Sequence, residues 1–447
     1  MMKKLKLLSL VLALLMVVGT GALAADEVEI SGSLESDLVA NLDNGNLTDT
    51  EKFNLILEKR FGFTADVYVD LEAKSFTLPS SKRETEVKIA EAYVNYYTKN
   101  MDWQLGKQKI SWGSSYKLQP TNYFNPRDLT ALKPMNEKVA VKAVKGTYYA
   151  PKRIEISGVV TPFFKTHQMS KEQKINLLNK FNNKVATMVS EIKGINSLQS
   201  DIKEKVINNP LDEVKDDVEN TQAGFKVTKR GLKGFDVSAT VYHGRDKLPI
   251  VDRDYLENQV NDLIRNYEEY VNQTNDPEGF ATYCDSNNKT LDSFILYPET
   301  NQVGIDVIGD INGIGVWSEV AYSMYEDDQF DNRIQATLGA DYKFENNLYL
   351  VGQVYYQQGR LDSEADIKAF NVHFDKPVFT FHTIEANAIY EAESETYLIE
   401  PQFTYSLANS TELQIGGTYK ESNSDSQSSL ISNLGDDRIY TRLKVEF

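Results

Sequence analysis

Apolar and polar residues alternate along most of the chain from residue 27 onward. In segment 334–344, for example, the even-numbered residues are apolar or aromatic, whereas the odd-numbered residues are mostly polar or charged. Alternation with a period of two places every second side chain on the same face of a strand. The pattern therefore predicts an all-β protein whose sheet has one apolar and one polar face.

The length of the alternating segments distinguishes a membrane-spanning sheet from the sheet of a water-soluble protein. The segments run for about 10–13 residues, longer than a typical strand of a water-soluble protein and close to that of a membrane-spanning strand. Short connections such as 60–62, 150–152 and 345–347 alternate with long ones at 113–137, 165–221, 244–299 and 422–435. Tight turns at one end and long loops at the other are typical of a transmembrane antiparallel up-and-down β-barrel.

The pattern predicts 16 or 18 strands, both of them even numbers as such a barrel requires. The uncertain hairpin is 366–375 with 378–390, because Asp375-Lys376-Pro377 is a mediocre turn sequence. The expected strands are 27–42, 50–60, 63–76, 86–98, 102–112, 138–149, 152–164, 222–231, 234–243, 300–310, 314–325, 332–344, 347–359, 366–375, 378–390, 396–407, 411–421 and 436–447.

Two of the long connections contain helical periodicity. Segment 172–207 has a heptad pattern, and segment 252–272 has one apolar helix face. We expect helical loop insertions at 165–221 and 244–299 on the extracellular side. They are interpreted either as caps on the barrel mouth or as docking surfaces for a partner.

Residues 1–24 do not show the alternation of the remaining chain but contain a continuous apolar run. Three lysines precede the apolar run from Leu7 to Val18, and Ala22-Leu23-Ala24 is a small-residue cleavage pattern. These are the parts of a cleaved signal peptide, which leaves residues 25–447 as the transmembrane β-barrel. A single Cys284 cannot form an internal disulfide, and no role is assigned to it.

The last strand carries the most specific sequence signal. Apolar and polar residues alternate from Ile439 to the terminal Phe447. This ending resembles the C-terminal recognition signal of bacterial outer-membrane β-barrels, which implies the bacterial outer membrane as location, with its lipids and the barrel-assembly machinery as partners. The residues that carry the signal are Tyr440, Leu443, Val445 and Phe447.

A second resemblance covers about 25 residues. The segments 105–113 (LGKQKISWG) and 123–129 (YFNPRDL) resemble a G-[R/K]-Q-x-x-x-W-G strand end and an N-P-x-D-L loop of large porin-like barrels, including alginate-export-like ones and others of unknown function. The resemblance supports the barrel architecture more than a particular substrate. The leading hypothesis is a passive channel for small hydrophilic solutes or ions. A homotrimer is one oligomeric state common in that class, but the sequence shows no interface.

The segment 113–137 follows the first of these motifs directly. We hypothesise that it folds inward and narrows the pore; an external loop held by Asn-Pro turns is the alternative. Acids dominate the lumen-facing positions of the first three strands, so one wall is expected to be negative with a positive wall opposite. The expected pore-lining or constriction residues are Lys107, Lys109, Trp112, Arg127, Asp128, Asp66, Asp70, Glu72, Arg153 and Arg333.

Composition excludes several other classes of protein. With 41% hydrophobic residues the chain lacks the apolar runs of a polytopic helical membrane protein, and a net charge of −17 argues against nucleic-acid binding. The four histidines have no metal-ligand spacing, so neither a metal nor a cofactor is expected. A hydrolase using His167 or His243 near Asp246 is the weakest reading, and no catalytic residue is assigned. A surface-display or adhesion barrel with a blocked lumen is the main alternative to a channel.

Overall fold

The computed structural model describes residues 28–77, 83–135, 137–169, 173, 182–183, 186, 218–286, 295–327, 330–359, 365–422, 430–431 and 437–447. The predicted signal peptide lies outside the described residues, and so does nearly all of the predicted heptad segment 172–207.

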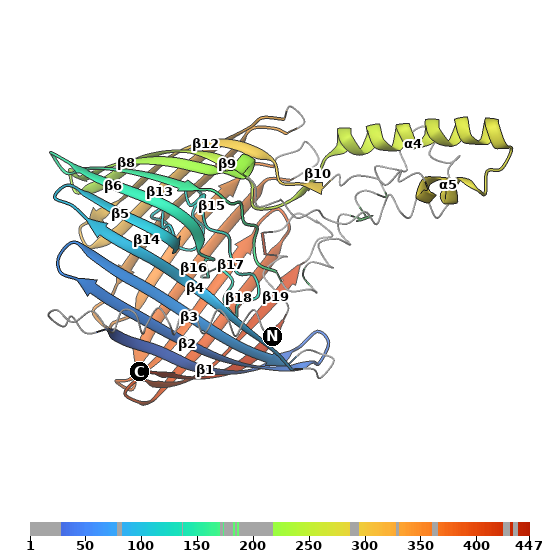
Figure 1. Cartoon of the computed structure of the whole chain (residues 1–447). Coiled ribbons are helices and arrows are strands. Elements are labelled where there is room, and N and C mark those ends of the chain that lie inside the picture. Colours follow the sequence, from blue (N-terminus) through green and yellow to red (C-terminus); the bar gives the residue numbers. More distant parts are fainter. Residues whose placement is uncertain are drawn as a thin grey trace, which may run out of the picture.

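Eighteen strands form one closed antiparallel barrel (Figure 1), which confirms the larger of the two predicted strand counts. Each strand pairs with its neighbours in the chain, and β9 pairs with β12 across a long connection. The barrel strands are β1 (Glu29–Asn41), β2 (Leu47–Phe61), β3 (Ala65–Thr77), β4 (Arg83–Tyr97), β5 (Met101–Gln108), β6 (Val141–Ala150), β7 (Ile154–Thr161), β8 (Gln222–Leu232), β9 (Phe235–Arg245), β12 (Glu299–Ile311), β13 (Ile314–Tyr325), β14 (Arg333–Lys343), β15 (Tyr349–Gln357), β16 (Ile367–Val378), β17 (His382–Glu391), β18 (Thr396–Ala408), β19 (Thr411–Ser422) and β20 (Arg438–Glu446).

The first and last strands close the barrel. β1 pairs with β20 from Ser33↔Glu446 to Asn41↔Arg438. Beyond that ladder, the Phe447 N–H donates to the carbonyl of Gly32 (3.1 Å), and the Gly32 N–H donates to the carbonyl of Phe447 (2.9 Å). Because every barrel strand then has two partners, the barrel sheet has no unpaired edge strand.

The uncertain hairpin is present, but its turn is not where the sequence suggested. β16 continues through Asp375-Lys376-Pro377 to Val378, and the turn falls at 379–381. Pro377 fits in the strand because the pairing of β16 with β15 ends at Asp375, so on that side no partner needs its missing N–H. Phe379 and Thr380 adopt positive φ angles of 48° and 74°, which sequence rules reserve for Gly or Asn.

The two faces of the sheet have opposite chemistry. Large apolar side chains such as Leu338, Ile305 and Phe370 are exposed on the outer wall, while the alternate residues Thr337, Asp306 and Asn371 are buried inside. A water-soluble protein would not expose apolar side chains around its whole circumference. The outer wall is therefore the surface of a membrane-spanning barrel. No helix among the described residues is long and apolar enough to cross a membrane.

The long connections gather at one end of the barrel, and the opposite end has short turns such as 62–64, 312–313 and 409–410 (Figure 1). Helix α4 (Arg253–Thr274) projects from the loop end, inside the insertion expected at 244–299. It begins at Asp252, whose side chain accepts the Tyr255 N–H, and it ends at Asn275 in the left-handed conformation. The same connections contain α5 (Phe280–Ser286), the short strands β10 (Ile250–Val251) and β11 (Ile295–Leu296), and the 3-10 helix η2 (Val218–Asn220).

Candidate channel lumen and its inward loop

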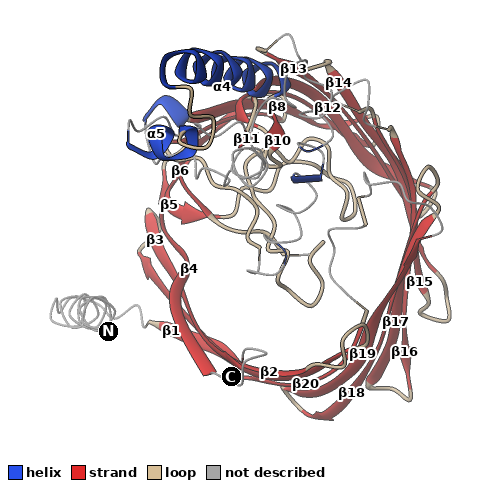
Figure 2. Cartoon of the chain, turned by 90° about the vertical axis from the view of Figure 1, so that its right-hand side faces the viewer, coloured by secondary structure: helices blue, strands red, loops and turns tan. Residues whose placement is uncertain are grey.

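The connection between β5 and β6, residues 109–140, lies inside the barrel. Figure 2 views the molecule from the loop end and shows loop backbone crossing the interior of the ring. Backbone and side-chain groups of this inward loop bond to the inner faces of β13, β15 and β20, all distant in sequence. The loop is therefore attached to the far side of the barrel as well as to the strands that it connects.

Glu319 of β13 is the strongest of these attachments. One of its carboxylate oxygens accepts the N–H groups of Ser114 (2.7 Å) and Ser115 (2.6 Å). The other accepts the N–H (2.9 Å) and the hydroxyl (2.8 Å) of Thr121. Glu319 is fully buried, and four donors compensate the cost of burying its charge.

A second attachment is Gln353 of β15. Its oxygen accepts the Tyr116 N–H (3.0 Å) and the Trp317 indole N–H (2.9 Å), while its amide nitrogen donates to the carbonyl of Leu118 (3.2 Å). Further along the inward loop, the guanidinium of Arg438 on β20 donates to the carbonyl of Leu132 (2.7 Å). The loop is thus held at several points along its length.

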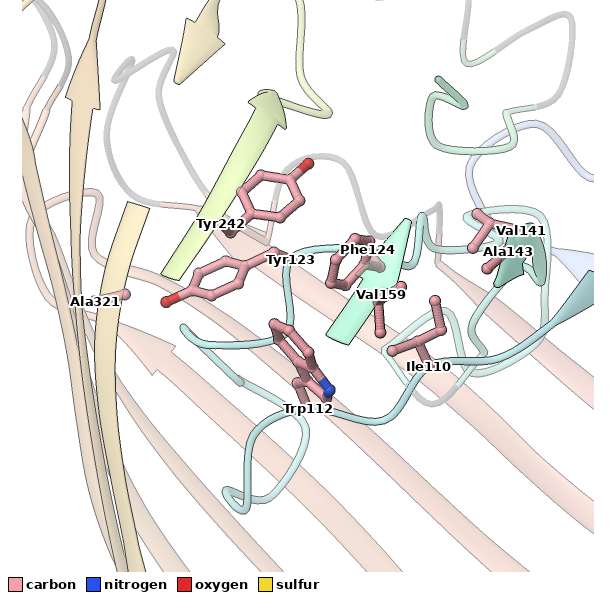
Figure 3. Close-up of a cluster of buried hydrophobic side chains, with 9 residues drawn as sticks. All are labelled: Ile110, Trp112, Tyr123, Phe124, Val141, Ala143, Val159, Tyr242 and Ala321. Atoms are coloured by element: carbon pink, nitrogen blue, oxygen red, sulfur yellow. The ribbon is translucent and has the colours of Figure 1, made fainter. Parts of the chain in front are cut away.

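Apolar packing fixes the base of the inward loop against the wall (Figure 3). Trp112 and Phe124 meet edge to face with centroids 5.0 Å apart, and Phe124 meets Tyr242 in the same manner at 5.1 Å. Gly224 of β8 leaves room for both rings, since a Cβ there would lie 2.8 Å from Phe124 and 2.9 Å from Trp112. Trp112 is buried in this cluster, so the expectation that it lines the pore was wrong.

The inward loop covers only part of the inner wall. Under it, side chains on β13 and β15 lose contact with solvent: Glu319 is 0%, Trp317 5% and Gln353 4% exposed. Away from it, the inward-facing basic side chains keep substantial exposure, with Lys52 at 32%, Lys88 at 30% and Arg442 at 24%, whereas their acidic partners are more buried, with Glu72 at 12% and Asp37 at 8%. The wall from β20 through β1 to β4 is called the open sector below.

A row of alternating charges crosses the open sector. Arg442 of β20 forms two bonds to Asp37 of β1 (2.6 and 2.8 Å) and lies 3.6 Å from Glu35. Glu35 is directly opposite Lys52 of β2 in the strand register. Glu72 of β3 pairs with both Lys52 (3.3 Å) and Lys88 of β4 (2.7 Å). We call these six residues the charge belt: Arg442, Asp37, Glu35, Lys52, Glu72 and Lys88.

The charge belt corrects the expected separation into a negative and a positive wall. Acids do dominate β1 and β3, but Arg442 of the last strand lies beside Asp37 because the barrel closes there. Lys52 and Lys88 then flank Glu72 on its two neighbouring strands. Acids and bases therefore alternate along one wall.

Other residues expected in the lumen lie elsewhere on the inner wall. Asp66 accepts bonds from Asn95 (2.7 Å) and Tyr97 (2.7 Å), and Asp70 accepts one from Asn54 (2.6 Å). The ammonium group of Lys109 lies 3.9 Å from Glu91, and that of Lys107 donates to the carbonyl of Ile89. Gly106, beside them, has a φ of +135° and approaches the Ala92 carbonyl too closely for any Cβ.

Arg153 does not line the barrel. It is exposed in the tight turn between β6 and β7, where its φ is +58°. The alternating pattern predicts a strand from residue 152, but the turn occupies residues 151–153 and β7 begins only at Ile154. The turn lies at the end of the barrel opposite the long loops, so Arg153 cannot contribute to a constriction by the inward loop.

Arg127 and Asp128 organise the inward loop itself. The guanidinium of Arg127 donates to the carbonyl of Lys117 (3.0 Å), and its N–H donates to Nδ1 of His167 (2.8 Å). Asp128 accepts the N–H (2.9 Å) and the hydroxyl (2.6 Å) of Thr130. Both residues thus stabilise the conformation of the inward loop.

Segment 163–168 packs on the inward loop, where the Leu129 N–H donates to the carbonyl of Gln168 (2.9 Å). Segment 244–250 lies beside segment 163–168 and contains a buried lysine that the sequence did not single out. Lys247 donates to Gln222 (2.6 Å), and its ammonium lies 4.8 Å from the centroid of Phe164. Burial lowers the pKa of Lys247 to about 7. The carboxylate of its neighbour Asp246 lies 3.2 Å from the guanidinium of Arg333 on β14. Arg333 therefore faces the interior but is covered by segment 244–250.

The two histidines near the loop end do not converge on one site. His167 lies against the inward loop, whereas His243 shares the outward face of β9 with Val241 and bonds to Asn301 (2.9 Å). Within the described ranges, no group of three His, Cys, Asp or Glu side chains is arranged to hold a metal ion.

The bond between His167 and Arg127 leads to a pH prediction. Burial, with Arg127 and Lys247 nearby, lowers the pKa of His167 to about 3, so Nδ1 remains a neutral acceptor. When segment 163–168 detaches from the inward loop, His167 becomes exposed to water and regains an ordinary pKa near 6.5. Below pH 6.5, the free energy needed to detach this segment should therefore fall by about 1.4 kcal/mol per pH unit, down to the lowered pKa of His167. We expect the hydrogen-exchange protection factor of the Arg127 amide to fall across this range.

The matched variant is His167→Gln, which keeps an acceptor that does not titrate. In that variant, protection of the Arg127 amide should not depend on pH over the same range. An identical pH dependence in both proteins would show that another group controls the opening.

The closed sheet, its apolar outer wall and its charged interior define the class of membrane-spanning β-barrels. The fold is similar to that of OccAB4 of Acinetobacter baumannii, at 9% identity over 94% of this chain and 97% of the other, with a TM-score of 0.51. It is also similar to that of OccK11 of Pseudomonas aeruginosa, at 9% identity over 94% and 95% of the two chains, with a TM-score of 0.50. No family model and no curated protein matches the chain. At such identities the likeness shows the fold alone.

Proposed function

We propose that the chain is a porin-like channel of the bacterial outer membrane, through which small hydrophilic solutes or ions diffuse passively. The open sector is the observation that carries this proposal. Lys52, Lys88 and Arg442 face the interior of a closed barrel and still keep about a quarter to a third of their side-chain surface exposed. Charged side chains that border water inside a membrane-spanning barrel are what an aqueous pathway requires.

In this proposal the inward loop is a fixed constriction. It covers the wall at β13 and β15, so solutes pass between the loop and the open sector. Arg127 belongs to the constriction through its bond to the Lys117 carbonyl. Replacing Arg127 by Ala should change single-channel conductance or ion selectivity, and unchanged values for both would remove Arg127 from the constriction.

Planar-bilayer recording of the purified, folded protein tests the channel. Stable single-channel steps in potassium chloride are the expected result. Persistent silence of protein that is folded would contradict the proposal. It would favour the alternative of a surface-display barrel, which is supported by the projection of α4 away from the barrel (Figure 1).

Location and assembly belong to the same proposal. The last strand presents Leu443 and Val445 to the lipid side and Tyr440 to the interior, where its hydroxyl donates to Gln402 (2.7 Å). We propose that this strand, ending at Phe447, is the segment that the barrel-assembly machinery recognises.

A further inference from the structure

The charge belt has no net charge. It contains three bases (Arg442, Lys52 and Lys88) and three acids (Asp37, Glu35 and Glu72), joined across five strands. Neighbouring strands are about 4.8 Å apart, so charges of opposite sign follow one another at that spacing along the wall. The field of such a row is strong close to the wall and cancels a short distance away from it.

The lysines of the charge belt can exchange partners at little cost, whereas the acids Asp37, Glu35 and Glu72 are largely buried. Lys52 and Lys88 remain about one third exposed to the lumen, and ion pairs with such exposure contribute roughly 0–1 kcal/mol. A solute that carries both a cation and an anion can therefore replace one pair by two new ones. A solute with one charge gains one contact and leaves one belt residue without its partner.

The charge belt borders the space through which a solute must pass. Glu137 of the inward loop is close enough to Lys52 to interact with it electrostatically. The part of the belt around Lys52 therefore lies near the inward loop. A solute crossing the constriction moves along the belt, within the short range of its field.

Building on the proposed function, we propose that the charge belt makes this channel selective for zwitterionic solutes such as α-amino acids and short peptides. Their ammonium and carboxylate groups are held a few bonds apart, which matches adjacent belt charges of opposite sign. The belt raises their concentration at the constriction relative to that of uncharged solutes of the same size. It attracts neither simple cations nor simple anions as a class.

The test compares the uptake of two isomers by liposomes that contain the purified barrel. Alanine is a zwitterion and lactamide is uncharged, yet they have the same atomic composition. Through the wild-type channel, alanine should enter about 2- to 5-fold faster than lactamide at low concentration. In Glu72→Gln with Lys88→Gln, which leaves the net charge unchanged, this ratio should fall. Adding Glu35→Gln and Lys52→Gln, which leaves only the Arg442–Asp37 pair of the belt, should lower the ratio further.

A matched control removes another ion pair from the inner wall. Lys226 of β8 and Asp306 of β12 lie 2.9 Å apart, but they are nearly buried and lie outside the open sector. Lys226→Gln with Asp306→Asn should keep the wild-type alanine-to-lactamide ratio. Conductance steps of each variant establish that it is folded and open.

The outcomes separate this proposal from the proposed function. If neither isomer enters, the protein is not a channel. If both enter at equal rates through the wild type, or if the belt variants keep the wild-type ratio, the protein is a channel and the belt does not select zwitterions.

Discussion

Replacement of Glu319 by Ala is expected to release the inward loop and to give larger, noisier single-channel steps. Four donors from Ser114, Ser115 and Thr121 would lose their acceptor. Each buried donor left without a partner costs about 1–3 kcal/mol. The loop can avoid that cost only by moving into water, which means leaving the wall of β13. Single-channel recording measures the result directly.

The control for this variant is Asp306→Asn. Asp306 lies directly opposite Glu319 in the strand register and is also a buried carboxylate, but its partner is Lys226 on β8. Within the described ranges it makes no hydrogen bond to the inward loop, so the control should keep wild-type conductance and low noise. Equal conductance of Glu319→Ala and wild type would show that Gln353 and the apolar cluster hold the loop without Glu319.

The strands were predictable because their pattern is local. Every second residue must be apolar on the lipid side, so alternation over about ten residues reveals each strand without knowledge of its partners. The hairpin of β16 and β17 shows the limit. Asp-Lys-Pro has the composition of a turn, whereas the actual turn uses Phe379 and Thr380 in conformations that those residues rarely adopt.

The site was less predictable because it depends on contacts between distant residues. Glu319 is one of many lumen-facing acids in the alternating pattern, and its partner Ser114 is 205 residues away. The same holds for Arg442, which alternation places on the inner face but which no local sequence signal connects with Asp37. Only closure of the barrel places the last strand beside the first. Sequence alone therefore indicated which residues face inward, but not which of them meet.

Deletion of Phe447 should strongly reduce the yield of folded barrel. Removing this residue takes away both backbone bonds to Gly32, at the seam where the first and last strands meet. It also removes a ring that stacks on Phe53 of β2, with centroids 6.1 Å apart. If the assembly machinery recognises the terminal aromatic residue, the deletion impairs recognition as well as closure. The measurement is the fraction of protein that migrates as a folded, heat-modifiable band.

Two substitutions separate these contributions. Phe447→Ala keeps the backbone bonds to Gly32 and loses only the ring, so any loss of yield in cells reports recognition or stacking. Refolding into detergent, where no machinery is present, distinguishes those two. Phe63→Ala is the control, because Phe63 is fully exposed in the turn between β2 and β3. A normal yield after deletion of Phe447 would mean that β1 and β20 close the barrel without this residue and that the assembly signal lies elsewhere.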